Sequence, residues 1–189
     1  MIWTCVRPSV MLWGMKPYMI IIDGPMGSGK TTVASLLNTK LKRTAHLSMD
    51  RIKFFVSDFR RGEEDNSMTT AVLMKMISEY IRQGINLLIA QGFWKKEYME
   101  PYIKIAKKNN LNLFVYQLEA PRTTLLERIN ERSKPKEAKT QVSKDRILKN
   151  LKMWEENKFA SEKAFDTSKV SAEEIIKTIL KDIKNSDQS

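Results

Sequence analysis

The sequence predicts a three-layer α/β/α fold, in which a five-stranded parallel sheet lies between two layers of helices and carries a helical lid. Three observations lead to this prediction. Short apolar runs alternate with stretches of helical periodicity along the chain, the pattern typical of parallel sheets. The first apolar run, over 17–23, passes through a glycine-rich loop into a helix. The chain has 189 residues, enough for one such domain with its own core.

The strands follow from runs of apolar and branched side chains. The continuous run Met19–Ile22 is typical of a strand buried on both of its faces. Ligands of open parallel sheets lie beyond the carboxyl ends of the strands, so polar residues there are candidates for a site. We expect the strands over 17–23, 44–50, 85–92, 111–120 and 163–168. The polar residues at or near the ends of the last four are Asp50, Gln91, Glu119 and Asp166.

The helices follow from apolar spacing and from capping residues. Ser67 is expected to cap a helix that Gly84 ends, and the polar stretch 61–66 before it is expected to be a loop. Ser171 and Glu174 form a capping box for the C-terminal helix. We expect helices over 29–41, 51–60, 67–83 and 95–109, then from Pro121, from Ser143 to Phe159, and after Ser171.

The glycine-rich loop Gly24–Thr31 reads GPMGSGKT and fits the pattern G-x-x-x-x-G-K-[ST] of a P-loop. Glycines let the backbone approach a ligand, and curled N–H groups at a helix start bind phosphate oxygens. Lys30 can reach the β- and γ-phosphates, and the Thr31 hydroxyl is placed to bind Mg²⁺. An ordinary glycine-rich turn would not need the strand before it and the helix after it. We therefore expect ATP on Gly24, Met26, Gly27, Ser28, Gly29, Lys30, Thr31 and Thr32.

Composition excludes several classes of protein. The single cysteine rules out a disulfide framework and fits a reducing, cytoplasmic location, and the single histidine argues against a histidine-based metal site. No apolar run approaches the roughly 20 residues of a membrane span. Residues 1–14 are interpreted as an N-terminal extension or an over-long start, or alternatively as a docking arm, ahead of one domain over 15–185.

The formal net charge is +11. A basic surface attracts nucleic acid or phosphorylated small molecules, whereas scattered lysines on solvated helices would give the same total. Both interpretations stay open at this point. The sequence gives no indication of the oligomeric state.

Asp50 is the first catalytic candidate outside the loop. It follows Lys30 by twenty residues at the expected end of the second strand, where a carboxylate can accept the proton of an attacking hydroxyl. A simple N-cap for the next helix is the alternative. Lys53 follows one turn later and is expected to bind an anionic acceptor, or else to be a solvated lysine.

Arg128 and Arg132 lie four residues apart on one predicted helical face. Phosphoryl transfer needs positive charge around the migrating group, and a mobile lid supplies it on closure. We expect a lid over about 128–144, with both arginines on ATP and Arg128 catalytic. Surface pairing with Glu127 and Glu131 is the alternative.

The segment after the third strand lacks the carboxylate that many P-loop ATPases carry there, because Gln91 occupies the position. This substitution counts against an ATP-hydrolysing motor or switch. The aromatic residues that follow are expected either to line an acceptor cleft or to belong to the core and surface: Phe93, Trp94, Tyr98 and Tyr102.

Taken together, these motifs resemble those of the small P-loop kinases, within the P-loop NTPase superfamily. The nearest group contains 5′-hydroxyl polynucleotide kinase domains, zeta-toxin-like and chloramphenicol-phosphotransferase-like enzymes, and gluconate and shikimate kinases. The resemblance covers about residues 17–182. It rests on GPMGSGKTT, LSMDRIK, LEAPRTTLLERINER and FDTSKVSAEEI.

The resemblance implies an ATP- and Mg²⁺-dependent kinase that phosphorylates a small molecule, a nucleotide or a polynucleotide. It implies that Lys30 binds the phosphates, that Asp50 activates the acceptor, and that Arg128 or Arg132 contacts the γ-phosphate. It further implies that segments near Pro121 and after Asp166 flank the adenine. Polynucleotide kinases carry an arginine where this chain has Lys53, a departure that weakens polynucleotide specificity. Two alternatives are a nucleotide-binding switch or ATPase acting on nucleic acid and a non-enzymatic nucleic-acid-binding domain.

Overall fold

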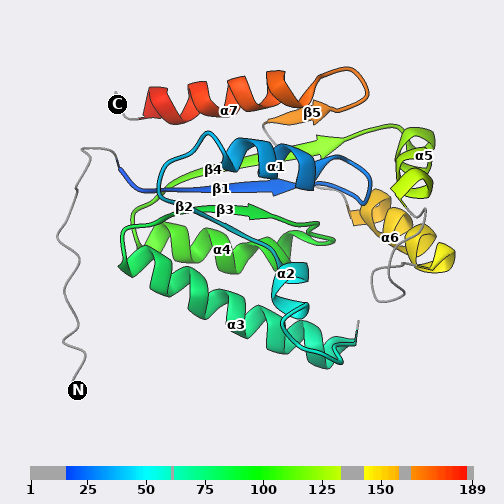
Figure 1. The fold of residues 1–189 in the computed structure, drawn as a ribbon, viewed down its shortest axis with the longest axis horizontal. Helices are drawn as coiled ribbons and strands as arrows, with labels where there is room; N and C mark the ends of the chain where they lie inside the picture. The colour runs from blue at the N-terminus through cyan, green and yellow to red at the C-terminus, as the bar shows by residue number, and fades with distance from the viewer. Residues whose placement is uncertain (1–15, 61, 133–142, 158–162, 187–189) are drawn as a thin grey trace.

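A computed structural model describes residues 16–60, 62–132, 143–157 and 163–186 (Figure 1). Its five strands form one parallel sheet in the order β2-β3-β1-β4-β5. The sheet, flanked by helices on both faces, confirms the predicted three-layer fold. The strands are β1 (Tyr18–Asp23), β2 (Thr44–Leu47), β3 (Asn86–Ala90), β4 (Asn112–Glu119) and β5 (Ala164–Asp166).

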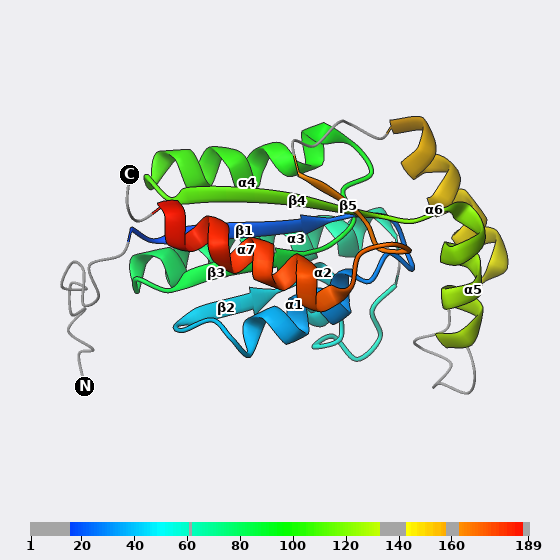
Figure 2. The same ribbon diagram turned by 90° about the horizontal axis from the view of Figure 1, so that it is seen from above.

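Helices cover both faces of the sheet and its carboxyl edge. Figure 1 shows α1 and α7 above the sheet, α3 and α4 below it, and α5 and α6 beyond the strand ends. Figure 2 shows the same arrangement from above, with α7 crossing the sheet. The helices are α1 (Lys30–Asn38), α2 (Met49–Lys53), α3 (Glu63–Arg82), α4 (Lys96–Lys108), α5 (Arg122–Arg132), α6 (Lys144–Asn157) and α7 (Ala172–Ser186).

β1 lies at the centre of the sheet and every one of its residues is buried. Successive side chains of a strand point to opposite faces. Ile20 and Ile22 therefore belong to the apolar core beneath α1 and α7, while Met19 and Ile21 belong to the core against α3 and α4. This double burial explains why the strand is a continuous apolar run, and it places the residues after β1 at the middle of the carboxyl edge.

Three elements on the α2–α3 side differ from the prediction. β2 ends at Leu47, so Asp50 lies in α2 and not at a strand end. The Ser48 side chain accepts a hydrogen bond from the Arg51 N–H and caps α2, which has only five residues, so most of the helix expected over 51–60 is absent. α3 begins at Glu63, four residues before Ser67. Its first turn holds three acidic residues, which stabilise the positive end of the helix.

The predicted helix signals at Gly84 and Ser171 are confirmed. Gly84 has a φ of 67° and follows α3, and the N–H of Ile85 bonds the Tyr80 carbonyl as in a Schellman ending. The Ser171 hydroxyl accepts from the Glu174 N–H at 3.3 Å, and the Glu174 carboxylate accepts from the Ser171 N–H at 2.9 Å. The proposed extension 1–14 and lid residues 133–142 fall outside the described residues. Among those described, no helix is long and apolar enough to cross a membrane.

Candidate functional site

The P-loop joins the carboxyl end of β1 to the start of α1, and its backbone is what makes a phosphate site. Gly24, Gly27 and Gly29 have φ values of 149°, 85° and 89°. A Cβ on Gly24 would collide with the carbonyl oxygen of Leu118 and lie 2.7 Å from the Ser28 hydroxyl. A Cβ on Gly29 would meet nothing within 4 Å. The loop is therefore packed tightly against the sheet on one side and open on the other, as a phosphate cradle requires.

Lys30 opens α1 and folds back over the loop, where its ammonium donates to the Pro25 carbonyl at 2.6 Å. The first turn of α1 holds no acidic residue that would offset the positive end of the helix. Thr31 and Thr32 are exposed there, so the hydroxyl predicted to bind Mg²⁺ is accessible. The described residues hold no cluster of three or more histidine, cysteine or acidic groups that would bind a metal. Among the described residues, a Mg²⁺ ion would therefore be held by the Thr31 hydroxyl together with phosphate oxygens of the nucleotide and water.

Met26 and Ser28 contribute to the P-loop in other ways. Met26 is half-buried and packs against the apolar cluster of α5 and α6, which includes Leu125. The Ser28 side chain is fully buried.

Asp23, the last residue of β1, lies beside the P-loop and is not among the site residues predicted above. It is fully buried, and its Oδ1 accepts hydrogen bonds from the Gly24 N–H at 2.7 Å and the Phe93 N–H at 2.8 Å. Burial raises the pKa of this carboxyl to about 6, against the effect of those two hydrogen bonds and of Lys30. An acidic residue ending an otherwise apolar buried strand was the signal that could have identified it.

A cavity of about 230 Å³ opens beside the P-loop, between the start of α1 and the segment that leads from β5 into α7. Its wall combines P-loop residues with small and apolar side chains and one guanidinium. The lining residues are Ser28, Gly29, Thr32, Val33, Arg128, Thr167, Val170, Ser171, Ala172 and Ile175. The cavity adjoins the phosphate cradle and is the described space into which the rest of a nucleotide can extend.

Arg128 from α5 reaches this cavity. Its guanidinium donates to the Thr167 hydroxyl at 2.9 Å, to the Thr167 carbonyl at 2.8 Å, and to the Gly27 carbonyl at 3.5 Å. The structure thus brings one predicted arginine to the P-loop and ties it to the β5–α7 segment. Arg132 is the last residue of α5, but its side chain lies outside the described residues.

On the other side of the P-loop, Asp50 and Lys53 occupy unlike positions on α2. Asp50 is exposed, whereas Lys53 is 6% exposed and its ammonium donates to Asn66 of α3. Lys53 thus links α2 to α3, and the alternative of a solvated surface lysine is wrong. Its predicted contact with an acceptor stays a prediction.

The segment after β3 is divided between core and surface. Gln91 donates to the Tyr102 hydroxyl of α4 at 3.0 Å, and burial raises the pKa of Tyr102 to about 12. Phe93 is buried with its ring 5.2 Å from that of Tyr102, in an edge-to-face pair. Tyr98 is 54% exposed. Of the four aromatic residues considered for an acceptor cleft, Phe93 and Tyr102 are therefore core.

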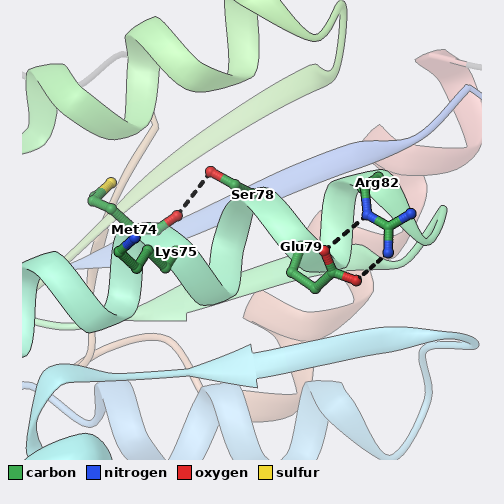
Figure 3. Close-up of a pocket in the computed structure, with 5 residues that line it drawn as sticks. All are labelled: Met74, Lys75, Ser78, Glu79 and Arg82. Carbon is green, nitrogen blue, oxygen red and sulfur yellow. Dashed lines mark hydrogen bonds and ion pairs between the residues drawn. The ribbon is translucent and has the colours of Figure 1, made fainter. Parts of the chain in front are cut away.

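A second hollow, of about 330 Å³, lies along α3 (Figure 3). Three of its polar side chains are already bonded within the helix: Ser78 to the Met74 carbonyl at 2.9 Å, and Arg82 to Glu79 at 2.6 Å. It lies in the C-terminal half of α3, away from the strand ends (Figure 1). We assign no chemistry to it. The lining residues are Met74, Lys75, Ser78, Glu79 and Arg82.

Comparison with known proteins agrees with this geometry. The model of a family described as AAA domain matches residues 19–156, more than half of the chain. No curated protein matches the sequence. Among solved structures, similar folds include the Mycobacterium tuberculosis APS kinase CysC in complex with AMPPNP and APS, at 14% identity and a TM-score of 0.63 over 90% of this chain and 99% of that one.

Two further structures are similar to a comparable extent. A sugar kinase from Janibacter sp. HTCC2649 has 15% identity and a TM-score of 0.63 over 90% of this chain and 98% of that one. The Deinococcus radiodurans tunicamycin resistance protein has 17% identity and a TM-score of 0.62 over 89% of this chain and 96% of that one. At these identities the likeness concerns the fold, which is that of the small P-loop kinases.

Proposed function

The chain belongs to the AAA domain family, and we propose that it is an ATP-dependent kinase that transfers the γ-phosphoryl group to a hydroxyl or phosphate of a small-molecule, nucleotide or polynucleotide acceptor. The observation that carries this proposal is the P-loop itself. Its three glycines form an open cradle, Lys30 lies across it, and a cavity of about 230 Å³ continues from it. Similar folds in an APS kinase bound to AMPPNP and in a sugar kinase support the proposal.

The nucleotide is proposed to lie with its phosphates on residues 24–32. Its sugar and base extend toward Thr167 and Val170, which line the cavity. This direction agrees with the expectation that the turn after Asp166 flanks the adenine. Arg128 would form one wall, where its planar guanidinium can contact the base or ribose.

The proposed chemistry uses positioning and charge more than covalent participation. Lys30 exchanges the Pro25 carbonyl for the β- and γ-phosphate oxygens, and P-loop N–H groups hold those oxygens in place. The Thr31 hydroxyl would hold Mg²⁺, which neutralises charge on the phosphates when bound. Asp50, exposed on α2, orients the acceptor hydroxyl and takes its proton.

A direct role for Arg128 at the γ-phosphate requires a change from the described arrangement. Its guanidinium must release Thr167, which it holds by two hydrogen bonds. We propose this release as part of closure of the lid over about 128–144, with Arg132 as a second cation. Arg128 then contributes to ATP binding before closure and to charge stabilisation after it.

The experiment that tests the proposal measures ADP release from MgATP across a panel of acceptors. The panel holds 5′-hydroxyl DNA and RNA oligonucleotides, nucleosides and their monophosphates, sugars and aminoglycoside-like alcohols, with Lys30→Ala protein as the blank. Release that depends on one acceptor class is the expected result. Release that is indifferent to small acceptors and stimulated by nucleic acid without phosphorylating it would favour the switch or ATPase.

A further inference from the structure

The Asp23 carboxylate joins two segments that are far apart in sequence. One is the P-loop, through the Gly24 N–H, and the other is the turn of residues 91–95 after β3, through the Phe93 N–H. We call residues 91–95 the acceptor-side turn, because they lead into α4 on the side of the P-loop opposite the nucleotide cavity. A single carboxylate oxygen accepts both hydrogen bonds, and both are buried.

A second contact between the two segments is independent of this carboxylate. A Cβ built on Gly92 would lie 3.1 Å from the Gly24 carbonyl oxygen and 3.7 Å from the Trp94 ring. The backbones of the P-loop and the acceptor-side turn therefore lie close together where the carboxylate bonds them, and an added side chain at Gly92 would be crowded there.

The surroundings of Asp23 make the burial of its carboxylate unfavourable for the stability of the fold. Gln117 is its register neighbour on β4, and the positive charge of Lys30 acts on the carboxylate. Asp23 Oδ2 and both polar atoms of the Gln117 amide are buried without a hydrogen bond of good geometry, although the Gln117 amide lowers the pKa of Asp23. A buried carboxylate is less favourable for stability than an apolar side chain unless its hydrogen bonds compensate, so its two hydrogen bonds to backbone N–H groups indicate a positioning function.

We propose that Asp23 is a positioning residue that couples the P-loop to the acceptor-side turn, so that occupancy of the P-loop by nucleotide orders the segment leading to Trp94 and α4. The inference rests on the proposed function, since it presumes that the P-loop binds nucleotide. A charged acceptor bonds N–H groups roughly twice as strongly as a neutral one, which explains a carboxylate here in place of an amide.

The test is hydrogen–deuterium exchange of the full chain at pH 7.5, with and without MgADP. The peptides that decide it cover 24–33 and 92–99. In the unaltered chain MgADP is expected to slow exchange in both peptides. Protection of 24–33 without any change in 92–99 would overturn the coupling while leaving nucleotide binding intact. Protection of neither peptide would instead contradict the proposed function.

Two substitutions then test the residue itself. In Asp23→Ala the Phe93 amide is expected to exchange roughly ten- to a hundredfold faster, the factor for losing a hydrogen bond to a charged group. MgADP should still protect 24–33 but no longer 92–99. Asp23→Asn keeps an oxygen in place, so it should restore most of the transmitted protection. If the alanine variant does not fold, Asp23→Asn still tests whether the charge of the carboxylate is needed for transmitted protection.

Asp182→Ala is the matched control. It makes the same chemical change as Asp23→Ala at a carboxylate that bonds the Tyr116 hydroxyl and Lys163, away from both segments. It should transmit MgADP protection to 92–99 like the unaltered chain. If Asp23→Ala transmits protection as fully as Asp182→Ala, the positioning role is wrong. Equal loss of transmission in both variants would also contradict it, because general loosening would then be the cause.

Discussion

The two sides of the P-loop are held in place by different kinds of interaction. On the nucleotide side, backbone conformation dominates, with three glycines at positive φ and carbonyl groups that meet the loop closely. On the acceptor side, side chains dominate: Lys53 bonds Asn66, and Gln91 bonds Tyr102. The proposed nucleotide side is thus formed largely by backbone groups, whereas the proposed acceptor side depends on side chains that also hold helices together.

This difference explains why the fold constrains recognition of the phosphates more than recognition of the acceptor. A backbone cradle recognises phosphate whatever the rest of the ligand is, and it tolerates few substitutions. Side chains on helices can be exchanged without disturbing the sheet, so the acceptor can vary on one scaffold. The following changes break or sharpen that contrast, in order of the size of effect we expect.

The largest effect is expected for Lys30→Ala. Removing the ammonium deprives the phosphates of their nearest positive charge, so ADP release with the best acceptor should fall about 1,000-fold. The unfolding midpoint should change little, because the ammonium donates to the Pro25 carbonyl at the surface of the P-loop and is not part of the apolar core. Lys40→Ala, an exposed lysine just beyond α1, is the control. Equal activity in both variants would remove the basis for the site.

Asp50→Asn should separate the two sides. Loss of the base is expected to reduce turnover about 100-fold. Nucleotide affinity, measured by calorimetry, should stay within about twofold, because Asp50 is exposed on α2 and not part of the P-loop. Asp58→Asn, also exposed, should have neither effect. A parallel loss of nucleotide affinity would show that Asp50 acts on the nucleotide and not on the acceptor.

Gly24→Ala compared with Gly29→Ala tests the backbone argument. A Cβ on Gly24 collides with the Leu118 carbonyl, so the free energy of unfolding should fall by about 3 kcal/mol or more. Gly29 has space around it, and only its φ of 89° is unfavourable for alanine. The free energy of unfolding of Gly29→Ala should therefore fall by about 1 kcal/mol. Urea denaturation measures both values. Equal losses would mean that the P-loop is not packed against β4 as described.

The stability of the chain should depend on the ionisation of Asp23. Its folded-state pKa is raised to about 6, so protonation stabilises the folded chain and this contribution is lost as pH rises through 6. Between pH 5 and 7 the unaltered chain should lose about 1 kcal/mol more unfolding free energy than Asp23→Asn. Urea denaturation of both proteins at the two pH values measures the difference. A difference of the opposite sign would mean that Asp23 is charge-stabilised.

The smallest of these effects is expected for Lys53→Met. The methionine fills the buried space, and water can replace the lost donor at the half-buried Asn66, so stability should fall by only about 0.5–1 kcal/mol. Nucleotide affinity should not change. Asn66→Ala should cost a similar amount, and the double variant should cost less than the sum, since the two residues are in contact. A large rise in the acceptor KM without loss of stability would instead support the predicted acceptor contact.

Prediction from sequence succeeded where a local pattern determines the backbone. The apolar run of β1, the glycines of the P-loop and the capping pair Ser171–Glu174 each specify their own conformation. It missed one local pattern, because Glu63–Asp65 were taken for a loop although acidic residues also favour a helix start. It failed as well where a contact across the fold decides.

Asp23 shows the same limitation within the site. Its two N–H donors lie one and seventy residues away along the chain, and only the adjacency of β1 and β3 brings Phe93 to it. Likewise, the burial of Lys53 depends on how α2 packs on α3. No spacing rule within a single sequence contains those relations.

The most direct measurement of the central claim is calorimetric titration of the chain with MgAMPPNP in the absence of any acceptor. Because the proposed nucleotide side is formed by backbone groups of the free chain, we predict one nucleotide bound per chain, with affinity unchanged in Asp50→Asn and at least about tenfold weaker in Lys30→Ala. An absence of binding by the unaltered chain would contradict the account. So would a loss of affinity in Asp50→Asn as large as that in Lys30→Ala.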